Sequence, residues 1–221
     1  MTLDEWLAFI ERQHVRSIDL ALDRVRSVQQ VLGQRKTCPV ILIGGTNGTL
    51  GACEVFAGHA LDAIILEVGL GGRLDATNLY EPDVAIVTGV DLDHMDYLGP
   101  TREHIGFEKA GIFRAGLPAI CGDPKPPQSL VDQAASLGAD LQILGRDFAY
   151  ERQEGQWQFR GRAGRRAALA FPALRGQGQL GNASCALAAL DAMRDRLPVA
   201  MQDIRRGLLE VELPGRFQIV P

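Results

Sequence analysis

The stretch Ile64-Ile-Leu-Glu-Val-Gly-Leu-Gly-Gly-Arg-Leu-Asp-Ala-Thr-Asn78 decides the fold that this sequence predicts. It begins with Ile64–Leu66, an apolar run rich in β-branched residues, which is typical of a strand buried on both faces. The run stops at Glu67, so we expect this carboxylate at the carboxyl end of a strand. Ligands bind at that edge in open parallel α/β sheets, and the pattern therefore predicts a binding site here.

The loop after this strand is rich in glycine, with Gly69, Gly71 and Gly72. Because glycine lacks a Cβ atom, these positions would let the backbone approach a phosphate or a metal-bound ligand closely. Arg73 and Asp75 add two opposite charges to the same loop. Glycine-rich turns after strands are also common without any ligand, so the spacing alone leaves both interpretations open.

Strand-like and helix-like patterns alternate along most of the chain. Short apolar runs predict strands at Pro39–Gly44, Ile64–Leu66, Val84–Thr88, Pro118–Cys121 and Leu141–Leu144. Helical patterns lie between them, weakly at 49–58 and more clearly at 101–113 and 130–137. This βαβα order predicts an α/β fold with a mainly parallel sheet flanked by helices.

The two ends of the chain differ from this middle part. Apolar residues at helical spacing predict two amphipathic helices before the first strand, and two more helices at 180–190 and 204–211. Residues 148–160 resemble two polar strands around Glu154 and Gly155, which predicts a small antiparallel sheet at about 147–171. With no internal repeat or linker-like segment, we expect one domain over residues 1–221.

Composition limits the possible classes of function. The chain has 221 residues, of which 46% are hydrophobic, enough for a large core. A net charge of −4 argues against a nucleic-acid or anionic-membrane partner, and we interpret the basic run at 160–166 as a solvated loop. No apolar run is long enough to span a membrane and no secretion-like leader is visible, so we expect a cytoplasmic protein.

The cysteines do not indicate a metal or disulfide site. They are scattered without C-x-x-C spacing, at Cys38, Cys53, Cys121 and Cys185. We therefore expect reduced thiols that are mostly buried.

Three loops at the carboxyl ends of predicted strands carry candidate ligands, and they are Gly45–Gly48, Glu67–Asn78 and Asp91–Asp96. Adjacent parallel strands lie about 4.8 Å apart, so these loops should converge on one crevice. If Glu67 and His94 come from neighbouring strands, they can share one Mg²⁺, with Lys109 facing the same crevice. The residues alone also allow plainer roles: a hydrogen-bonded structural histidine, aspartates that cap helices, and a surface lysine.

The longer motifs carry a family resemblance. Ile64–Asn78, the run Asp91-Leu-Asp-His-Met-Asp-Tyr-Leu-Gly99 and the run Glu108-Lys-Ala-Gly-Ile-Phe113 together resemble the folylpolyglutamate synthase and dihydrofolate synthase family. This family belongs to the Mur-ligase-like ATP-dependent ligases. The likeness extends to Gln179–Asn182 and Leu213–Gln218. It implies an ATPase domain of the P-loop NTPase and Mur-ligase central-domain type.

The resemblance implies roles for individual residues. ATP phosphates would be bound by Gly45, Thr46, Asn47 and Gly48, and the nucleotide would also contact Asn182 and Arg216. Magnesium ligands would be Glu67, His94 and Lys109, the last as a carbamate. Catalytic residues would be Lys109, Arg73 and Asp75, and the pterin-bearing substrate would contact Ile18, Asp19, Leu20, Leu74, Asp75 and Ala76.

The implied reaction forms an amide from a carboxylate. ATP phosphorylates dihydropteroate or a folate, and the amino group of L-glutamate attacks the resulting acyl phosphate. Metal ions and phosphate-loop donors would neutralise the developing charge, so no side-chain nucleophile is needed. The implied cofactors are ATP and Mg²⁺, the partners are these small molecules, and we expect a monomer.

Two departures from the family pattern limit this interpretation. The family loop continues from GTNG into Lys-Gly-Ser or Lys-Gly-Thr, whereas Gly48 is followed here by Thr49-Leu50-Gly51. We therefore expect an internal gap after Gly48, which removes the loop lysine. The family's C-terminal domain would follow Pro221 and is expected to be absent. The chain as written is then expected to turn over poorly, which leaves two alternatives: a non-catalytic binding remnant, or another Mur-type amino-acid ligase.

Overall fold

The computed structural model describes residues 22–23, 26–27, 38–44, 60–174, 176 and 178–212. Most of the two N-terminal helices and all of the weak helix at 49–58 that the sequence predicts lie outside these residues. In chain order the elements are β1 (Val40–Gly44), β2 (Ile64–Val68), the 3-10 helix η1 (Ala76–Leu79), β3 (Val84–Val87), α4 (Met95–Leu98), α5 (Arg102–Ala110), β4 (Pro118–Cys121), α6 (Gln128–Leu137), β5 (Asp140–Ile143), β6 (Ala149–Gln153), β7 (Gln156–Gly161), β8 (Gly164–Leu169), α7 (Gln179–Ala192) and α8 (Met201–Glu210).

The main sheet has the order β2-β1-β3-β4-β5, and all its pairings are parallel. The predicted α/β class is confirmed, and each predicted strand of this sheet is present. Strand β2 is two residues longer than predicted. Glu67 is therefore its next-to-last residue and pairs with Ile43 of β1. The prediction that β2 is buried on both faces was wrong. As an edge strand it leaves Ile65 62% exposed.

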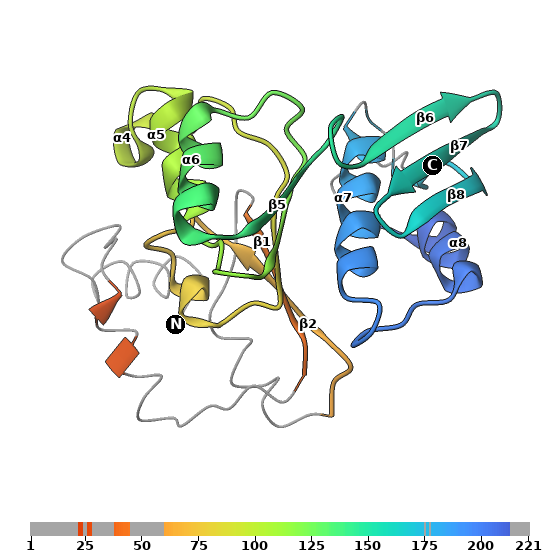
Figure 1. The fold of residues 1–221 in the computed structure, drawn as a ribbon, viewed down its shortest axis with the longest axis horizontal. Coiled ribbons are helices and arrows are strands. Elements are labelled where there is room, and N and C mark those ends of the chain that lie inside the picture. The colour runs from red at the N-terminus through yellow and green to blue at the C-terminus, as the bar shows by residue number, and fades with distance from the viewer. Residues whose placement is uncertain are drawn as a thin grey trace, which may run out of the picture.

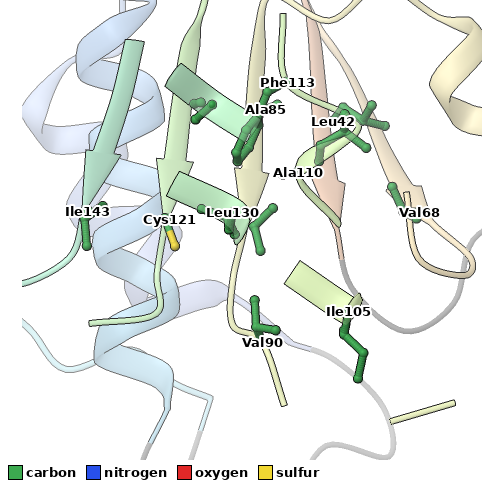
Figure 2. Close-up of a cluster of buried hydrophobic side chains, with 14 of the residues drawn as sticks. Leu42, Val68, Ala85, Val90, Ile105, Ala110, Phe113, Cys121, Leu130 and Ile143 are labelled. Carbon is green, nitrogen blue, oxygen red and sulfur yellow. The ribbon is translucent and has the colours of Figure 1, made fainter. Parts of the chain in front are cut away.

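Helices α5 and α6 cover one face of the sheet (Figure 1). The core on this face joins alternate residues of the strands, such as Leu42 and Val68, to Ile105 and Ala110 of α5 and Leu130 of α6 (Figure 2). Because side chains alternate along a strand, the intervening residues point to the other face. This core therefore packs α5 against one face of the sheet.

The other face is covered by α7, and a small antiparallel sheet with the order β6-β7-β8 packs on the far side of that helix (Figure 1). Ile41, Ile86 and Ile120 of the main sheet share one core with Trp157 and Phe159 of β7. The indole of Trp157 is fully buried, and its Nε1 donates to the carbonyl of Ala170 at 2.8 Å. The small sheet is therefore attached to the main sheet through a common core.

The basic run at 160–166 is mostly exposed to solvent, as the sequence predicts, but it is not a loop. It contains the end of β7, a two-residue turn and the start of β8. Three of its four arginines have partners, since Arg162 pairs with Asp140, Arg165 with Gln158 and Arg166 with Asp191. Only the pair of Arg165 and Gln158 lies across neighbouring strands, whereas Asp140 belongs to β5 and Asp191 to α7, so this polar segment gains its partners from several elements.

The described cysteines are free and buried, as the sequence predicts, and they are Cys38, Cys121 and Cys185. Burial raises the pKa of the Cys121 thiol to about 11 and that of Cys185 to about 12. Such thiols stay protonated and are poor nucleophiles or metal ligands.

Candidate functional site

The order of the strands defines where a ligand would bind. The chain passes from β1 to β2 on one side and then to β3 on the other side of β1. In doubly wound sheets of this order, the crevice between β1 and β3 at the carboxyl ends is the binding site. The segment Gly45–Gly48 directly follows β1 and lies outside the described residues, while the loop after β3 is described.

Glu67 reaches this edge from β2. Its neighbours Leu66 and Val68 are buried in the core beneath α5, whereas the Glu67 side chain is exposed on the opposite face. The prediction that Glu67 and His94 come from neighbouring strands was wrong, because β1 lies between β2 and β3. Two strand spacings amount to about 10 Å, so the two residues flank the end of β1 from either side.

His94 follows β3 at the start of α4, in a backbone conformation that is rare for a residue with a side chain. Its φ is +49° and its ψ is +41°. The carboxylate of Asp93 supports it, because Oδ1 accepts the His94 N–H at 2.8 Å and Oδ2 lies 3.6 Å from Nε2. Left-handed conformations of this kind occur often at functional sites, where the surrounding structure compensates for the strain.

The loop that carries His94 is anchored at its base. Arg102 of α5 donates to the carbonyl of Val90 at 2.9 Å and pairs with Asp123 at 2.7 Å. Asp123 in turn accepts the Val90 N–H at 3.2 Å. The loop is therefore joined both to α5 and to the end of β4.

Lys109 lies in the last turn of α5 and is only 8% exposed. Loss of hydration lowers the pKa of its amine, while the negative charge of Asp93 acts in the opposite direction. Asp93 thus lies near enough to influence both Lys109 and His94. A buried lysine with a lowered pKa has a larger neutral fraction, which is the form that reacts with CO₂.

Asp75 shapes the glycine-rich loop. Its Oδ2 accepts the N–H groups of Gly69 and Leu70 at 3.0 and 2.9 Å. Its Oδ1 accepts the N–H and the hydroxyl of Thr77 at 2.9 and 2.6 Å. Since a carboxylate offers about four acceptor positions, all of them are used within the loop. Asp75 is thus placed to organise the loop between Leu74 and Ala76 rather than to react.

Arg73 is paired with the helix that carries Lys109. Its Nη2 and Nε donate to Oε1 of Glu108 at 2.9 and 3.2 Å, and its guanidinium lies 5.6 Å from the centre of the Phe107 ring. The Arg73 N–H also donates to the Glu108 carbonyl at 2.9 Å. The arginine predicted as catalytic therefore joins the loop to α5.

The glycines of this loop serve the same contact. A Cβ atom on Gly71 would lie 2.8 Å from Cδ2 of Leu98, and one on Gly72 would lie 3.0 Å from the Glu108 carbonyl oxygen. Both residues have positive φ angles, +68° and +157°. For these two positions the close approach is to α4 and α5, whereas the sequence led us to expect an approach to a phosphate.

Asn182 is placed apart from these side chains, in the first turns of α7. It is one of the residues that line a cavity of about 370 Å³, whose walls are mainly apolar residues of α7 and α8. One turn later, Cys185 packs against Gly122, which follows β4, because a Cβ atom on Gly122 would lie 2.6 Å from the Cys185 Sγ. Asn182 therefore lies at the same edge of the sheet as the candidate site.

The remaining predicted site residues, Ile18, Asp19, Leu20, the loop Gly45–Gly48 and Arg216, lie outside the described residues. Sequence reasoning missed three residues that organise the site, namely Asp93, Glu108 and Asn78. The only signal for them was their place inside the three motifs, because contacts such as those of Glu108 with Arg73 and of Asn78 with Gly111 join residues that are remote in sequence.

The donor set is compatible with a magnesium site of the usual kind. Within the described ranges, no three His, Cys, Asp or Glu side chains are grouped so as to hold a metal ion. Mg²⁺ is commonly held by one or two carboxylates, with waters and substrate phosphates as the other ligands. Glu67 supplies one carboxylate, and Lys109 would supply a second if it were carbamylated.

Comparisons with known proteins agree with this class of fold and site. The Mur ligase middle domain model matches residues 26–125. The dihydrofolate synthase/folylpolyglutamate synthase of Haemophilus influenzae is 34% identical, and the match covers 99% of this chain and 64% of that protein. E. coli FolC, solved in complex with DHPP and ADP, is 36% identical with a TM-score of 0.88, covering 100% of this chain and 69% of FolC.

A bifunctional folylpolyglutamate synthase/dihydrofolate synthase with Mn, AMPPNP and L-glutamate bound is 32% identical, with a TM-score of 0.85, over 100% of this chain and 69% of that chain. The fold and the site edge define a Mur-ligase-like domain. More narrowly, the chain belongs to the dihydrofolate synthase/folylpolyglutamate synthase family.

The chain spans about two thirds of the length of these relatives. Its alignment with the Haemophilus influenzae protein runs over 286 positions, 65 more than the 221 residues of this chain. The relative therefore contains residues that have no counterpart here, even though 99% of this chain is matched. The sequence itself runs directly from Gly48 to Thr49, where we expected the gap.

Proposed function

We propose that this chain is the ATP-binding part of a ligase that adds L-glutamate to dihydropteroate, to folates, or to both. The observation that carries the proposal is the match of nearly the whole chain to proteins named for these reactions, at 34–36% identity. The buried Lys109 beside the loop of His94 supports it, because an amine with a lowered pKa can form a carbamate, and a carbamate can hold a cation against the phosphates.

The reaction proceeds in two steps. A carboxylate oxygen of the acceptor attacks the γ-phosphorus of ATP, ADP leaves, and an acyl phosphate forms. The amine of L-glutamate then attacks the acyl carbon, loses a proton, and phosphate leaves as the amide forms. Positioning and charge neutralisation provide most of the rate, which agrees with a site made of backbone donors, carboxylates and a lysine.

Glu67, His94 and Lys109 are proposed to hold the divalent cation, with Mg²⁺ as the physiological ion. Neutral Lys109 would attack CO₂ through Nζ and release a proton to solvent, which gives a carbamate. A bound cation would neutralise phosphate charge during the transfer. Two structurally similar relatives were solved with nucleotides, and one of them contains Mn.

The nucleotide and the acceptor would occupy separate loops. We assign ATP phosphates to Gly45–Gly48 and to Arg216, and the base to Asn182, whose cavity is large enough for a heterocycle. Leu74 and Ala76, held by Asp75, would contact the pterin-bearing acceptor together with Ile18–Leu20. Asp75 would act mainly by keeping this loop in shape.

The cellular location and the oligomeric state of the protein are proposed as well. None of the helices among the described residues is long and apolar enough to cross a membrane. We propose a cytoplasmic monomer with small-molecule partners, folded as one domain over residues 1–221 with the small sheet included.

A direct test incubates the purified chain at high concentration with ATP, Mg²⁺, L-glutamate and dihydropteroate or tetrahydrofolate, and follows the product by mass spectrometry. We expect slow formation of a product one glutamate heavier, because the phosphate-loop lysine is missing and the proposed Arg216 contact remains. Glu67→Gln should abolish the product, whereas the distant surface variant Arg194→Gln should not change it.

Other outcomes would decide against the proposal. Calorimetric binding of ATP and Mg²⁺ without any product would favour the non-catalytic binding protein. A product formed only with an amino-acid or peptide acceptor would favour another Mur-type ligase. Tight ATP binding that is unaffected by Arg216→Ala would show that the nucleotide site is wrongly assigned.

A further inference from the structure

Asn78, at the end of the glycine-rich stretch, makes an unusual number of specific contacts. Its Nδ2 donates to the carbonyl of Arg73 at 3.0 Å and to the carbonyl of Gly111 at 3.1 Å. Its Oδ1 accepts from Nη2 of Arg114 at 3.0 Å. Both amide hydrogens and the amide oxygen are therefore used, which fixes the orientation of the side chain.

The two acceptors belong to different elements that meet at this point. Arg73 lies in the loop that follows β2, the strand of Glu67. Gly111 is the C-cap of α5 and follows Lys109 by two residues. The last carbonyls of a helix have no partner within the helix, so the Asn78 amide satisfies one of them and ties the helix end to the loop.

The contact between loop and helix is close along its whole length. The Arg73 N–H donates to the Glu108 carbonyl at 2.9 Å. A Cβ atom on Gly111 would lie only 2.3 Å from Cβ of Arg73, and one on Gly72 would lie 3.1 Å from the Lys109 carbonyl oxygen. The backbone around Lys109 is therefore held by the loop on one side and by the core of α5 on the other.

We propose that Asn78 is a positioning residue that sets the place of Lys109 relative to Glu67 by locking the C-terminal turn of α5 onto the loop after β2. The proposal rests on the proposed function, in which Lys109 and Glu67 serve the same cation site. A ligand set must be held within about 0.5 Å to bind a metal well, and Asn78 bridges the two elements beside the Arg73–Glu108 pair. Supporting residues of this kind typically change metal affinity about 10- to 100-fold when they are mutated.

The test compares Asn78→Asp with Arg114→Gln. Asn78→Asp keeps the shape and the acceptor for Arg114 but removes both donors to Arg73 and Gly111. Arg114→Gln removes the ion pair with Glu81 and the donors to Asn78, but leaves the two bonds from Nδ2 in place. Both variants thus disturb the contacts around Asn78, and only the first removes the Asn78 bonds to the loop and to the end of α5.

Two readouts report on the site independently of turnover. Titration with Mn²⁺, followed by electron paramagnetic resonance at a temperature where all variants are folded, gives the cation affinity. Carbon-13 NMR with labelled bicarbonate detects a lysine carbamate, and Lys109→Arg identifies its signal. We expect Asn78→Asp to weaken Mn²⁺ binding at least tenfold and to reduce the carbamate signal, and Arg114→Gln to stay within twofold of the original chain.

Equal Mn²⁺ affinity and carbamate signal in Asn78→Asp and the original chain would overturn the positioning role and leave the proposed function intact. Equal losses in Asn78→Asp and Arg114→Gln would also overturn it, since they would indicate general loosening. If the original chain gives neither Mn²⁺ binding nor a carbamate, the cation site of the proposed function is wrong and the role of Asn78 falls with it.

Discussion

At the scale of single residues, Lys109 is the most informative side chain of the site. It is 8% exposed, and loss of hydration lowers the pKa of its amine against the opposing effect of Asp93. A charged lysine is expensive to bury, so its presence in the last turn of α5 costs stability. Such a cost is compatible with function, because stability is often lower at sites that bind or react.

The pH dependence of stability tests this cost. A folded-state pKa below the ordinary 10.5 means that the unfolded chain binds the proton more readily, so the penalty is full below the folded pKa and disappears as pH rises toward 10.5. In CO₂-free buffer, we expect Lys109→Met to have a higher Tm than the original chain at pH 7, by a margin that shrinks toward pH 10.5. Thermal denaturation followed by circular dichroism measures the Tm of the variant and of the original chain at each pH.

Lys125 provides the control, because it is exposed. Lys125→Met should leave Tm nearly unchanged at every pH. A Lys109→Met variant that is less stable than the original chain at pH 7 would show that the amine makes a favourable interaction that outweighs its dehydration.

At the scale of elements, the contact between α5 and the loop after β2 depends on glycine. Residues 35 positions apart, Arg73 and Glu108, are joined there by backbone and side-chain hydrogen bonds. Gly111 permits the approach, because its missing Cβ would lie 2.6 Å from the Cα of Arg73. A backbone atom cannot move aside as easily as a flexible side chain.

We therefore expect Gly111→Ala to destabilise the fold by about 1–3 kcal/mol, as overpacking in a tight contact usually does. Gly207→Ala is the matched control, because Gly207 lies inside α8 and nothing lies within 4 Å of its missing Cβ. That substitution should stabilise by roughly 0.5–1 kcal/mol through helix propensity. Urea unfolding gives both values, and a neutral Gly111→Ala would contradict the close contact.

At the scale of the whole molecule, one hydrophobic core joins the main sheet, α7 and the small antiparallel sheet. Arg166 of β8 also forms an ion pair with Asp191 of α7, whose side chain is only 5% exposed. A shared core of this kind predicts that the small sheet does not unfold separately.

Trp157 in β7 allows this cooperativity to be measured. In a Trp6→Phe background its fluorescence reports on the small sheet alone, because the chain has only two tryptophans. We expect its urea transition to coincide with that of far-ultraviolet circular dichroism. Arg166→Met should lower the free energy of unfolding obtained from both curves by roughly 3–5 kcal/mol, since it leaves a buried carboxylate unpaired. Separate transitions would contradict a single domain over residues 1–221.

The sequence by itself determined the strands of the main sheet, the α/β class and the family, because apolar runs and motifs are local patterns. It also placed Glu67 and His94 at strand ends of the same sheet. It did not predict β8, because the arginines of that segment gain their partners, such as Gln158 and Asp191, only in the folded chain.

Only the tertiary structure decided which strands are adjacent and what each site residue contacts. The place of β1 between β2 and β3, the full use of Asp75 within its own loop and the burial of Lys109 follow from packing between distant segments. Asn78 and Gly111 are 33 residues apart, and no local pattern relates them. The physical reason is that burial and hydrogen bonding are properties of a residue's surroundings, and those surroundings exist only when the whole chain has folded.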